Sequence, residues 1–110
     1  MAKRIIDPGK YAYFEGQYVP IEQANVSILT HSFNYGTALF EGIRGYYRKD
    51  DGQVLIFRLK EHVDRLVRNF NILCMDVPET REDIARICVE LVKRSEFKEG
   101  VYLRPIVYKS

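Results

Sequence analysis

The stretch from Thr30 to Tyr46, T-H-S-F-N-Y-G-T-A-L-F-E-G-I-R-G-Y, constrains the fold more than any other part of the chain. From Leu39 onward its side chains alternate with a period of two, which is the period of a β-strand. One predicted face carries Leu39, Glu41, Ile43 and Gly45, and the opposite face carries Phe40, Gly42, Arg44 and Tyr46. A glycine inside a strand indicates that another group approaches the backbone closely, and Gly42 has this position. Taken alone, the pattern describes a half-buried strand with Arg44 directed to water.

Length and composition narrow the class of protein. A chain of 110 residues can form one domain, and 46% hydrophobic with 29% charged residues is typical of a globular rather than a disordered protein. The 17 basic and 15 acidic residues are too balanced for a nucleic-acid-binding surface. No apolar run approaches the ~20 residues of a membrane helix, and residues 1–8 lack the pattern of a signal peptide. We therefore expect a cytoplasmic domain that binds neither nucleic acid nor a membrane.

The cysteines and histidines do not form a recognisable reactive or metal-binding pattern. Cys74 and Cys88 have no metal-type spacing and apolar neighbours, which predicts two buried free thiols and no metal site. His31 and His62 have neither a second metal ligand close in sequence nor the partners of a catalytic triad. We interpret both histidines as structural.

Several strands are predicted from the pattern of aromatic and β-branched residues. Residues 11–19 form a hairpin around Glu15-Gly16, and a short strand follows at residues 26–29. Residues 39–47 and 53–57 form a second antiparallel hairpin, because the charged segment between them ends in Asp-Gly. A last strand covers residues 101–108.

Two helices are predicted between the second hairpin and the last strand. Apolar residues at three- and four-residue steps indicate a helix over residues 60–72, and a second helix covers residues 84–94 after a capping box of Thr80 and Asp83. The outer face of the first helix is predicted to be solvated, and it carries Lys60, Glu61, Asp64, Arg65, Arg68 and Asn69. Because strands and helices occur in separate runs, the fold class is α+β, an antiparallel sheet with two helices.

Three motifs resemble one enzyme family. The pattern H-x-x-x-Y-G-T-x-x-F-E-G-I-R at residues 31–44 resembles the N-terminal part of branched-chain amino acid aminotransferases, which are class IV (fold type IV) enzymes that use pyridoxal 5'-phosphate. The segments I-F-R-L-K-E-H-V-D-R-L and V-Y-L-R-P resemble the same family, in the same order and at similar separations. The resemblance implies the small domain of that fold, with leucine, isoleucine, valine and glutamate or 2-oxoglutarate as substrates. It also implies a homo-oligomer, since the family forms dimers.

The resemblance implies a cofactor-binding role for Arg58. This arginine lies where the return strand meets the first long helix, and it matches the family position that contacts the cofactor phosphate. Backbone N–H groups at a helix N-terminus also favour an anion there. The alternative is an arginine that caps the sheet edge or pairs with Glu61.

The resemblance also implies a substrate pocket. The positions that match pocket residues of the family are Phe40, Gly42, Tyr102 and Arg104. An aromatic wall suits a branched side chain, and Gly42 leaves space for it. The γ-carboxylate of glutamate cannot lie unpaired in such a pocket without a cost of several kcal/mol, and Arg104 matches the residue that pairs with it. The alternative for Phe40 and Tyr102 is plain core packing.

Two further positions complete the predicted substrate-binding set. Tyr35 matches a tyrosine that reaches the pocket of the neighbouring subunit in the family's dimer. Arg44 lies beside the pocket residues in sequence.

The chain has no candidate for the Schiff-base lysine. In the family this lysine, and the carboxylate that faces the pyridine nitrogen, lie beyond the matching region. The seven lysines here are in polar turns, near the termini or on helix faces, and none is in the apolar setting that lowers a lysine pKa. We therefore expect no catalytic residue and no transamination from this chain alone. Because it stops directly after a strand-like segment, we expect residues 1–110 to be one domain of a longer two-domain enzyme.

Other functions remain open at this point. The D-amino acid aminotransferases and aminodeoxychorismate lyases share the same small-domain layout, although F-E-G-I-R together with Y-L-R-P favours the branched-chain type. A stand-alone binding module without chemistry would also lack the lysine. Such a module would behave as a clean monomer, whereas an isolated small domain exposes an apolar face and self-associates.

Overall fold

The computed structural model describes residues 9–110, so the prediction about a signal peptide lies outside the described residues. The elements in chain order are β1 (Tyr11–Phe14), β2 (Gln17–Pro20), the 3-10 helix η1 (Ile21–Gln23), α1 (His31–Tyr35), β3 (Ala38–Phe40), β4 (Ile43–Arg48), β5 (Gln53–Ile56), α2 (Leu59–Ile72), α3 (Arg81–Ser95), β6 (Val101–Leu103) and β7 (Ile106–Tyr108). Every strand pair is antiparallel. The predicted α+β class is confirmed, with α1 as a short additional helix.

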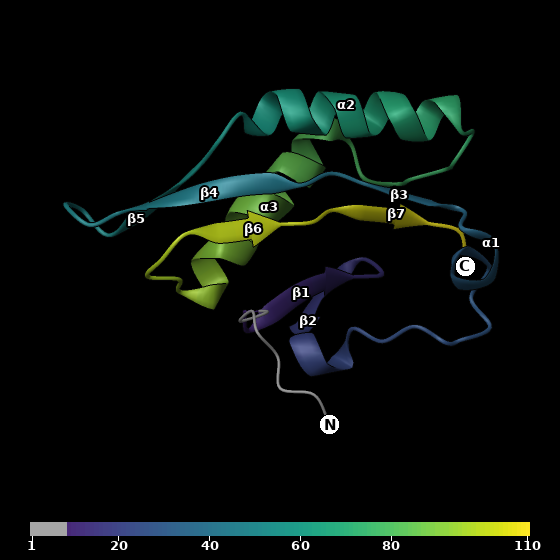
Figure 1. Cartoon of the computed structure of the whole chain (residues 1–110), viewed down its shortest axis with the longest axis horizontal. Helices are drawn as coiled ribbons and strands as arrows, with labels where there is room; N and C mark the ends of the chain where they lie inside the picture. The colour runs from purple at the N-terminus through teal and green to yellow at the C-terminus, as the bar shows by residue number, and fades with distance from the viewer. Residues whose placement is uncertain (1–8) are drawn as a thin grey trace.

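The centre of the molecule is a long two-stranded ribbon, in which β3 and β4 run beside β7 and β6 (Figure 1). Phe40 pairs with Ile106 on one side of a break, and Ile43 pairs with Leu103 on the other. Across the break the Glu41 N–H donates to the Pro105 carbonyl at 3.1 Å, so the register is the same on both sides. Pro105 has no N–H to donate, which explains why each predicted long strand is interrupted here.

The second predicted hairpin forms from Gly45 onward. β4 and β5 pair from Gly45 opposite Ile56 to Arg48 opposite Gln53. In the turn, Arg48 forms an ion pair with Asp51, and Gly52 takes the left-handed conformation with φ 69° that favours glycine.

The first hairpin is also confirmed, but it forms a separate two-stranded sheet, β1–β2. Its turn residues Glu15 and Gly16 both have positive φ, 50° and 84°, as a two-residue type I′ turn requires. The hairpin packs against α3, where the Arg94 guanidinium lies 4.1 Å from the centre of the Tyr18 ring.

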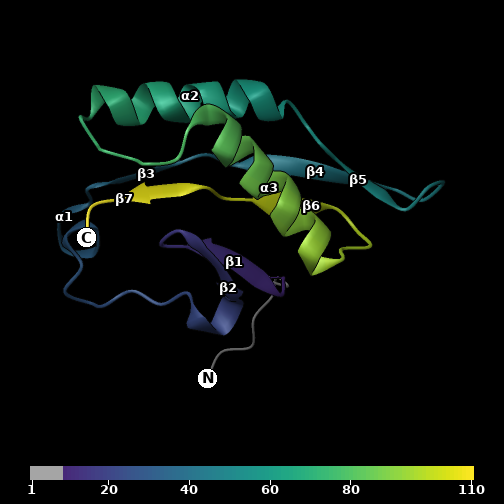
Figure 2. The ribbon, with the colours of Figure 1, turned by 180° about the vertical axis from the view of Figure 1, so that it is seen from behind.

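The two long helices and the inward face of the ribbon form the core. The buried cluster comprises Val63, Leu66, Val67 and Phe70 of α2 and Ile84 of α3, and Leu39 and Val107 of the ribbon pack against it. Figures 1 and 2 show α3 crossing one side of the ribbon, with α2 beside it. The predicted capping box is present, because Asp83 N–H donates to Thr80 Oγ1 at 3.1 Å and Thr80 N–H donates to Asp83 at 2.9 Å.

The strand predicted at residues 26–29 is wrong. The Ser27 hydroxyl accepts the Leu29 N–H at 3.0 Å and the Ser27 carbonyl accepts the Thr30 N–H at 3.0 Å, which makes a turn in place of a strand. Ile28 and Leu29 are 73% and 83% exposed. The turn leads into α1, which Ser32 joins to the end of β7 through hydrogen bonds with the main chain of Lys109.

The prediction of two buried thiols is half right. Both cysteines are free, but only Cys88 is buried, among the core residues of α3, whereas Cys74 is exposed after the end of α2. Burial raises the pKa of the Cys88 thiol to about 11. Apolar neighbours in sequence suggested that Cys74 is in the core, but Cys74 lies in a connecting segment, where its side chain is exposed.

Candidate functional site

The two faces predicted from the alternation are observed. Glu41, Ile43 and Gly45 are buried toward the helices, whereas Phe40, Arg44 and Tyr46 are exposed on the other side. The ribbon's second strand contributes Tyr102, Arg104 and Ile106 to the same exposed side. We call this side the open face, and its members are Phe40, Gly42, Arg44, Tyr46, Tyr102, Arg104 and Ile106.

Gly42 is the point of closest approach on the open face. A Cβ built on Gly42 would lie 2.9 Å from Cζ of Tyr102 and closer still to its hydroxyl oxygen. The close approach predicted at Gly42 is therefore real, and the group that approaches is the Tyr102 side chain. The space above this glycine belongs to Tyr102 rather than to open solvent.

Arg104 lies between two aromatic rings. Its guanidinium carbon is 4.5 Å from the centre of the Phe40 ring and 5.4 Å from that of Tyr102, and its Nη2 donates to the Tyr102 hydroxyl at 3.3 Å. No carboxylate among residues 9–110 pairs with it. An arginine held by aromatic faces, with no anionic partner in the described chain, can bind a carboxylate of a ligand.

Arg58 precedes α2 at the end of β5. It is the N-cap residue, with the left-handed φ of 51° that is uncommon for a residue with a side chain. Its guanidinium lies 5.7 Å from the centre of the Phe57 ring, and that ring lies 6.3 Å from the Tyr46 ring of the open face. Arg58 is exposed, and no ion pair with Glu61 occurs within residues 9–110. The side chain is thus placed at the border of the open face.

Of the two remaining predicted residues, Arg44 lies within the open face and Tyr35 lies outside it. Arg44 is exposed on β4 opposite Tyr102 of β6, within the open face. Tyr35 lies on α1, at the outer end of the β3–β7 pair (Figure 1). The centre of its ring is 4.7 Å from that of His31, with the rings tilted by 45°, and the residue is 74% exposed. Phe40, Gly42, Arg44, Tyr102 and Arg104 are therefore brought together within one chain, and Tyr35 is apart from them.

Sequence reasoning missed the ion cluster beneath the site. Glu41 is 5% exposed and accepts hydrogen bonds from Arg65 Nε at 2.7 Å, Arg65 Nη2 at 2.6 Å and His62 Nδ1 at 2.8 Å. Arg65 is exposed, as predicted for the outer face of the first long helix, but its guanidinium also pairs with the buried Glu41 carboxylate, which was not predicted. The sequence did contain a signal for this cluster, because the alternation places Glu41 on the inward face of the strand. A buried carboxylate there requires cationic partners.

These partners keep Glu41 ionised. The Arg65 hydrogen bonds lower the pKa of the Glu41 carboxyl, burial acts in the opposite direction, and the His62 hydrogen bond lowers the pKa further. The other predicted structural histidine, His31, has Nδ1 2.7 Å from the Thr37 hydroxyl.

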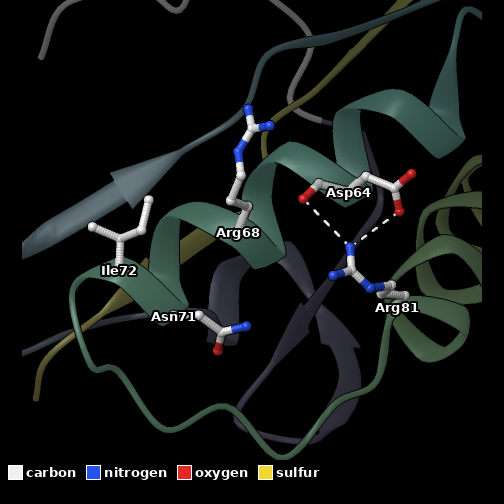
Figure 3. A pocket seen from close by; sticks show the side chains of 5 residues that line it. All are labelled: Asp64, Arg68, Asn71, Ile72 and Arg81. Carbon is white, nitrogen blue, oxygen red and sulfur yellow. Dashed lines mark hydrogen bonds and ion pairs between the residues drawn. The ribbon is translucent and has the colours of Figure 1, made fainter.

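A hollow of about 680 Å³ lies between α2 and the start of α3 (Figure 3). It is lined by Asp64, Arg68, Asn71, Ile72 and Arg81. Arg81 is directed to Asp64, with Nη1 3.1 Å from Oδ1, and Arg68 points away from both. No residue of the open face lines this hollow, so it is separate from the candidate site.

Comparison with known proteins identifies the family. Residues 38–110, which contain the whole ribbon, match the family model for amino-transferase class IV. The chain belongs to the class IV aminotransferases. The class IV match includes every candidate site residue except Tyr35.

Curated relatives and solved structures agree with this class IV assignment. The chain is 46% identical over 98 residues to a probable branched-chain-amino-acid aminotransferase of Aquifex aeolicus, covering 89% of this chain and 32% of that protein. The branched-chain aminotransferase of Thermoproteus uzoniensis with norvaline superposes with a TM-score of 0.83 at 39% identity, covering 91% of this chain and 33% of that one. The branched-chain amino acid aminotransferase of Thermobaculum terrenum in its PLP-bound holo form gives 0.82 at 34% identity, covering 91% and 33%. The chain spans about a third of the length of the relatives it matches.

The residues present fit the phosphate end of the class IV cofactor, pyridoxal phosphate. An exposed guanidinium at a helix N-terminus, with no ion pair inside residues 9–110, is a suitable donor set for a dianion. When bound, the cofactor supplies a ring that withdraws electrons from the amino acid. Arg58 would hold the phosphate of this cofactor.

In residues 9–110 no three His, Cys, Asp or Glu side chains gather in a way that could hold a metal ion. None of the helices formed by these residues has the length and apolar character to cross a membrane.

Proposed function

We propose that this chain is the N-terminal small domain of a longer two-domain, pyridoxal-phosphate-dependent branched-chain amino acid aminotransferase. The complete enzyme transfers an amino group between leucine, isoleucine or valine and 2-oxoglutarate. It acts in the cytoplasm as a homo-oligomer, most simply a dimer. The coverage of about a third of each relative supports a protein longer than this chain.

The observation that carries this proposal is the placement of Arg104 between Phe40 and Tyr102. Two aromatic rings form an apolar wall that suits a branched aliphatic side chain. The guanidinium in the same wall pairs with the γ-carboxylate of glutamate, which would be costly to bury alone. One surface thereby accepts both an apolar and an acidic substrate, as this transfer requires.

The remaining site residues have supporting roles in the proposal. Arg58 binds the cofactor phosphate at the N-terminus of α2. Gly42 allows Tyr102 to lie close to the ribbon backbone, and Arg44 adds positive charge on the same face. Tyr35, exposed on α1, reaches the pocket of a second copy.

The chain does not catalyse the transfer by itself under this proposal. All six lysines of the described part, Lys10, Lys49, Lys60, Lys93, Lys98 and Lys109, are exposed. None of them lies in the desolvated, apolar setting that activates a lysine for Schiff-base chemistry. A coupled assay of this chain with leucine, 2-oxoglutarate and added cofactor should show no turnover, and clear turnover would contradict the proposal.

The decisive experiment uses the full-length protein that contains this segment. Activity with L-leucine and 2-oxoglutarate is expected, and Arg104→Gln should raise KM for glutamate at least tenfold while changing KM for leucine less than threefold. Arg68→Gln, an exposed arginine outside the open face, is the control and should change neither value. A preference for D-alanine, or lyase activity on aminodeoxychorismate, would assign the chain to another class IV enzyme.

The alternative to an enzyme domain is a stand-alone binding module without catalytic activity. The open face exposes large apolar side chains, with Phe40 56%, Tyr102 53% and Ile106 55% exposed, which a partner domain would cover. Size-exclusion chromatography of the 110-residue chain at several concentrations should therefore show self-association. A monomer at every concentration would favour the independent module.

A further inference from the structure

Glu41 is the only charged residue in the part of the chain that the structure describes to be classed as buried. Its neighbours in the chain are Phe40 and Gly42, two residues of the open face, but its own side chain points to the opposite side of the ribbon. Burying a carboxylate is costly unless it is fully paired. Glu41 is retained in the interior because Arg65 and His62 pair with it in the ion cluster beneath the open face.

The partners of Glu41 come from the first turns of α2. His62 and Arg65 are three residues apart and so lie on the same side of the helix. Arg65 donates from Nε at 2.7 Å and from Nη2 at 2.6 Å, and His62 Nδ1 lies 2.8 Å away. Both carboxylate oxygens are thus paired with donors of fixed direction, which sets the position and the rotation of α2 relative to the ribbon.

The backbone of Glu41 makes a connection in the other direction. Its N–H donates to the Pro105 carbonyl at 3.1 Å, one residue after Arg104. At the start of α2, the His62 N–H donates to the Arg58 carbonyl at 3.1 Å. Glu41 is therefore linked to Arg58 through His62, and to Pro105, the residue that follows Arg104 on the ribbon.

Apolar packing would not set this geometry as closely. The contacts of Leu66, Val67 and Phe70 with the ribbon have no direction, and helices can shift on such surfaces at small cost. A shift that separated Glu41 from Arg65 would leave a buried carboxylate without its main partner. Each lost hydrogen bond would lower the population of the shifted arrangement several-fold. The ion cluster consequently favours one arrangement of α2 on the ribbon.

We propose that Glu41 is a positioning residue that holds Arg58 in place relative to Phe40, Gly42 and Arg104. Through Arg65 and His62 it aligns the cofactor-phosphate residue with the substrate wall, without contacting either ligand. The inference deepens the proposed function and rests on it, since Arg58 needs alignment only if it binds a phosphate that belongs to the same site.

The test measures phosphate binding by the 110-residue chain with pyridoxine 5'-phosphate, which lacks the reactive aldehyde and cannot couple to surface lysines. Binding is followed by NMR through the Arg58 Nε–H signal. Glu41→Gln keeps the shape but removes the charge, and it should weaken binding at least fivefold and shift the backbone amides of both Gly42 and Arg58.

A matched control separates positioning from general destabilisation. Val92→Ala opens the core on α3, away from the ion cluster, and should lower the free energy of unfolding while leaving the affinity within twofold of the wild type. Should Glu41→Gln not fold, Arg65→Lys serves instead, because Arg65 is 54% exposed and the lysine keeps the charge but not the two-pronged geometry. We expect Arg65→Lys to weaken binding at least threefold.

The outcomes distinguish this inference from the proposed function. If Arg58→Gln abolishes binding but folded Glu41→Gln or Arg65→Lys binds like the wild type, the positioning role is wrong and the phosphate role of Arg58 stands. If the wild type and Arg58→Gln bind equally, the phosphate role fails, and the positioning role fails with it. If Val92→Ala weakens binding as much as Glu41→Gln, the effect is one of stability and the inference is overturned.

Discussion

The Tyr102 ring lies against the backbone of Gly42, at a distance that leaves no room for a Cβ on this residue. Both belong to the open face, Gly42 at the break between β3 and β4 and Tyr102 on β6. The contact holds the tyrosine beside Arg104, whose Nη2 donates to the Tyr102 hydroxyl at 3.3 Å. Gly42, the smallest residue of the motif, thereby sets the position of the large Tyr102 side chain.

Gly42→Ala should displace the Tyr102 ring and lower the free energy of unfolding by about 1–2 kcal/mol, the usual cost of overpacking. The φ of Gly42 is not in the left-handed region, so alanine meets only the steric problem. In a Tyr102→Ala background the same change should cost less than ~0.5 kcal/mol, since the clash is gone. Urea unfolding of the four proteins measures the coupling, and equal costs in both backgrounds would show that the contact is unimportant.

Arg58→Gly should stabilise the chain by about 0.5–1 kcal/mol while removing phosphate binding. Glycine adopts positive φ without the penalty that a side chain incurs, and Arg58 has φ 51°. Glu96→Gly is the matched control, because Glu96 has φ 52° at the end of α3. It should give a similar gain in thermal unfolding and leave phosphate binding unchanged. A loss of stability in Arg58→Gly would mean that its side chain contributes to folding.

The ion cluster predicts a specific acid sensitivity. The pKa of Glu41 is lowered in the folded chain, first by the Arg65 hydrogen bonds and then by His62, from an ordinary value of 4.5. Its stabilisation is therefore present above about pH 4.5 and is lost as the pH falls through the lower folded-state pKa. Relative to the wild type, Glu41→Gln should be less stable by about 1–3 kcal/mol at pH 7, and the difference should shrink toward pH 2.5.

The control for this pH series is Asp51→Asn. The Asp51 carboxylate pairs with Arg48 in an exposed turn, where water and salt screen the interaction. Its effect on unfolding at pH 7 should be clearly smaller than that of Glu41→Gln. A difference for Glu41→Gln that stays constant from pH 7 to pH 2.5 would show that its charge is not what stabilises the fold.

The two cysteines should differ in reactivity with a thiol reagent at pH 8. Cys74 is exposed, whereas Cys88 is buried in the core and its pKa is raised to about 11, so it has almost no thiolate. One thiol should react quickly in the native chain and two should react in urea, as measured by mass spectrometry. Cys74→Ser should abolish the fast reaction, and fast labelling of that variant would contradict the burial of Cys88.

Local sequence patterns were sufficient for several elements. The two-residue alternation correctly separated the Glu41–Ile43 face from the Phe40–Arg44 face, because strand geometry alone sends neighbouring side chains to opposite sides. The capping box at Thr80 was likewise correct, since it depends on residues three apart. The strand predicted at residues 26–29 failed because a strand needs a partner, and Ser27 instead stabilises a local turn.

The sequence by itself determined the family, the α+β class, the long helices and the half of the open face that β3 and β4 contribute, because these follow from local periodicity and from motifs within single segments. The tertiary structure alone decided that Tyr102 occupies the space above Gly42, that Arg104 lies between Phe40 and Tyr102, and that the exposed Arg65 pairs with Glu41. These contacts join residues far apart in the chain. They depend on strand register and helix placement, which the packing of the whole domain fixes.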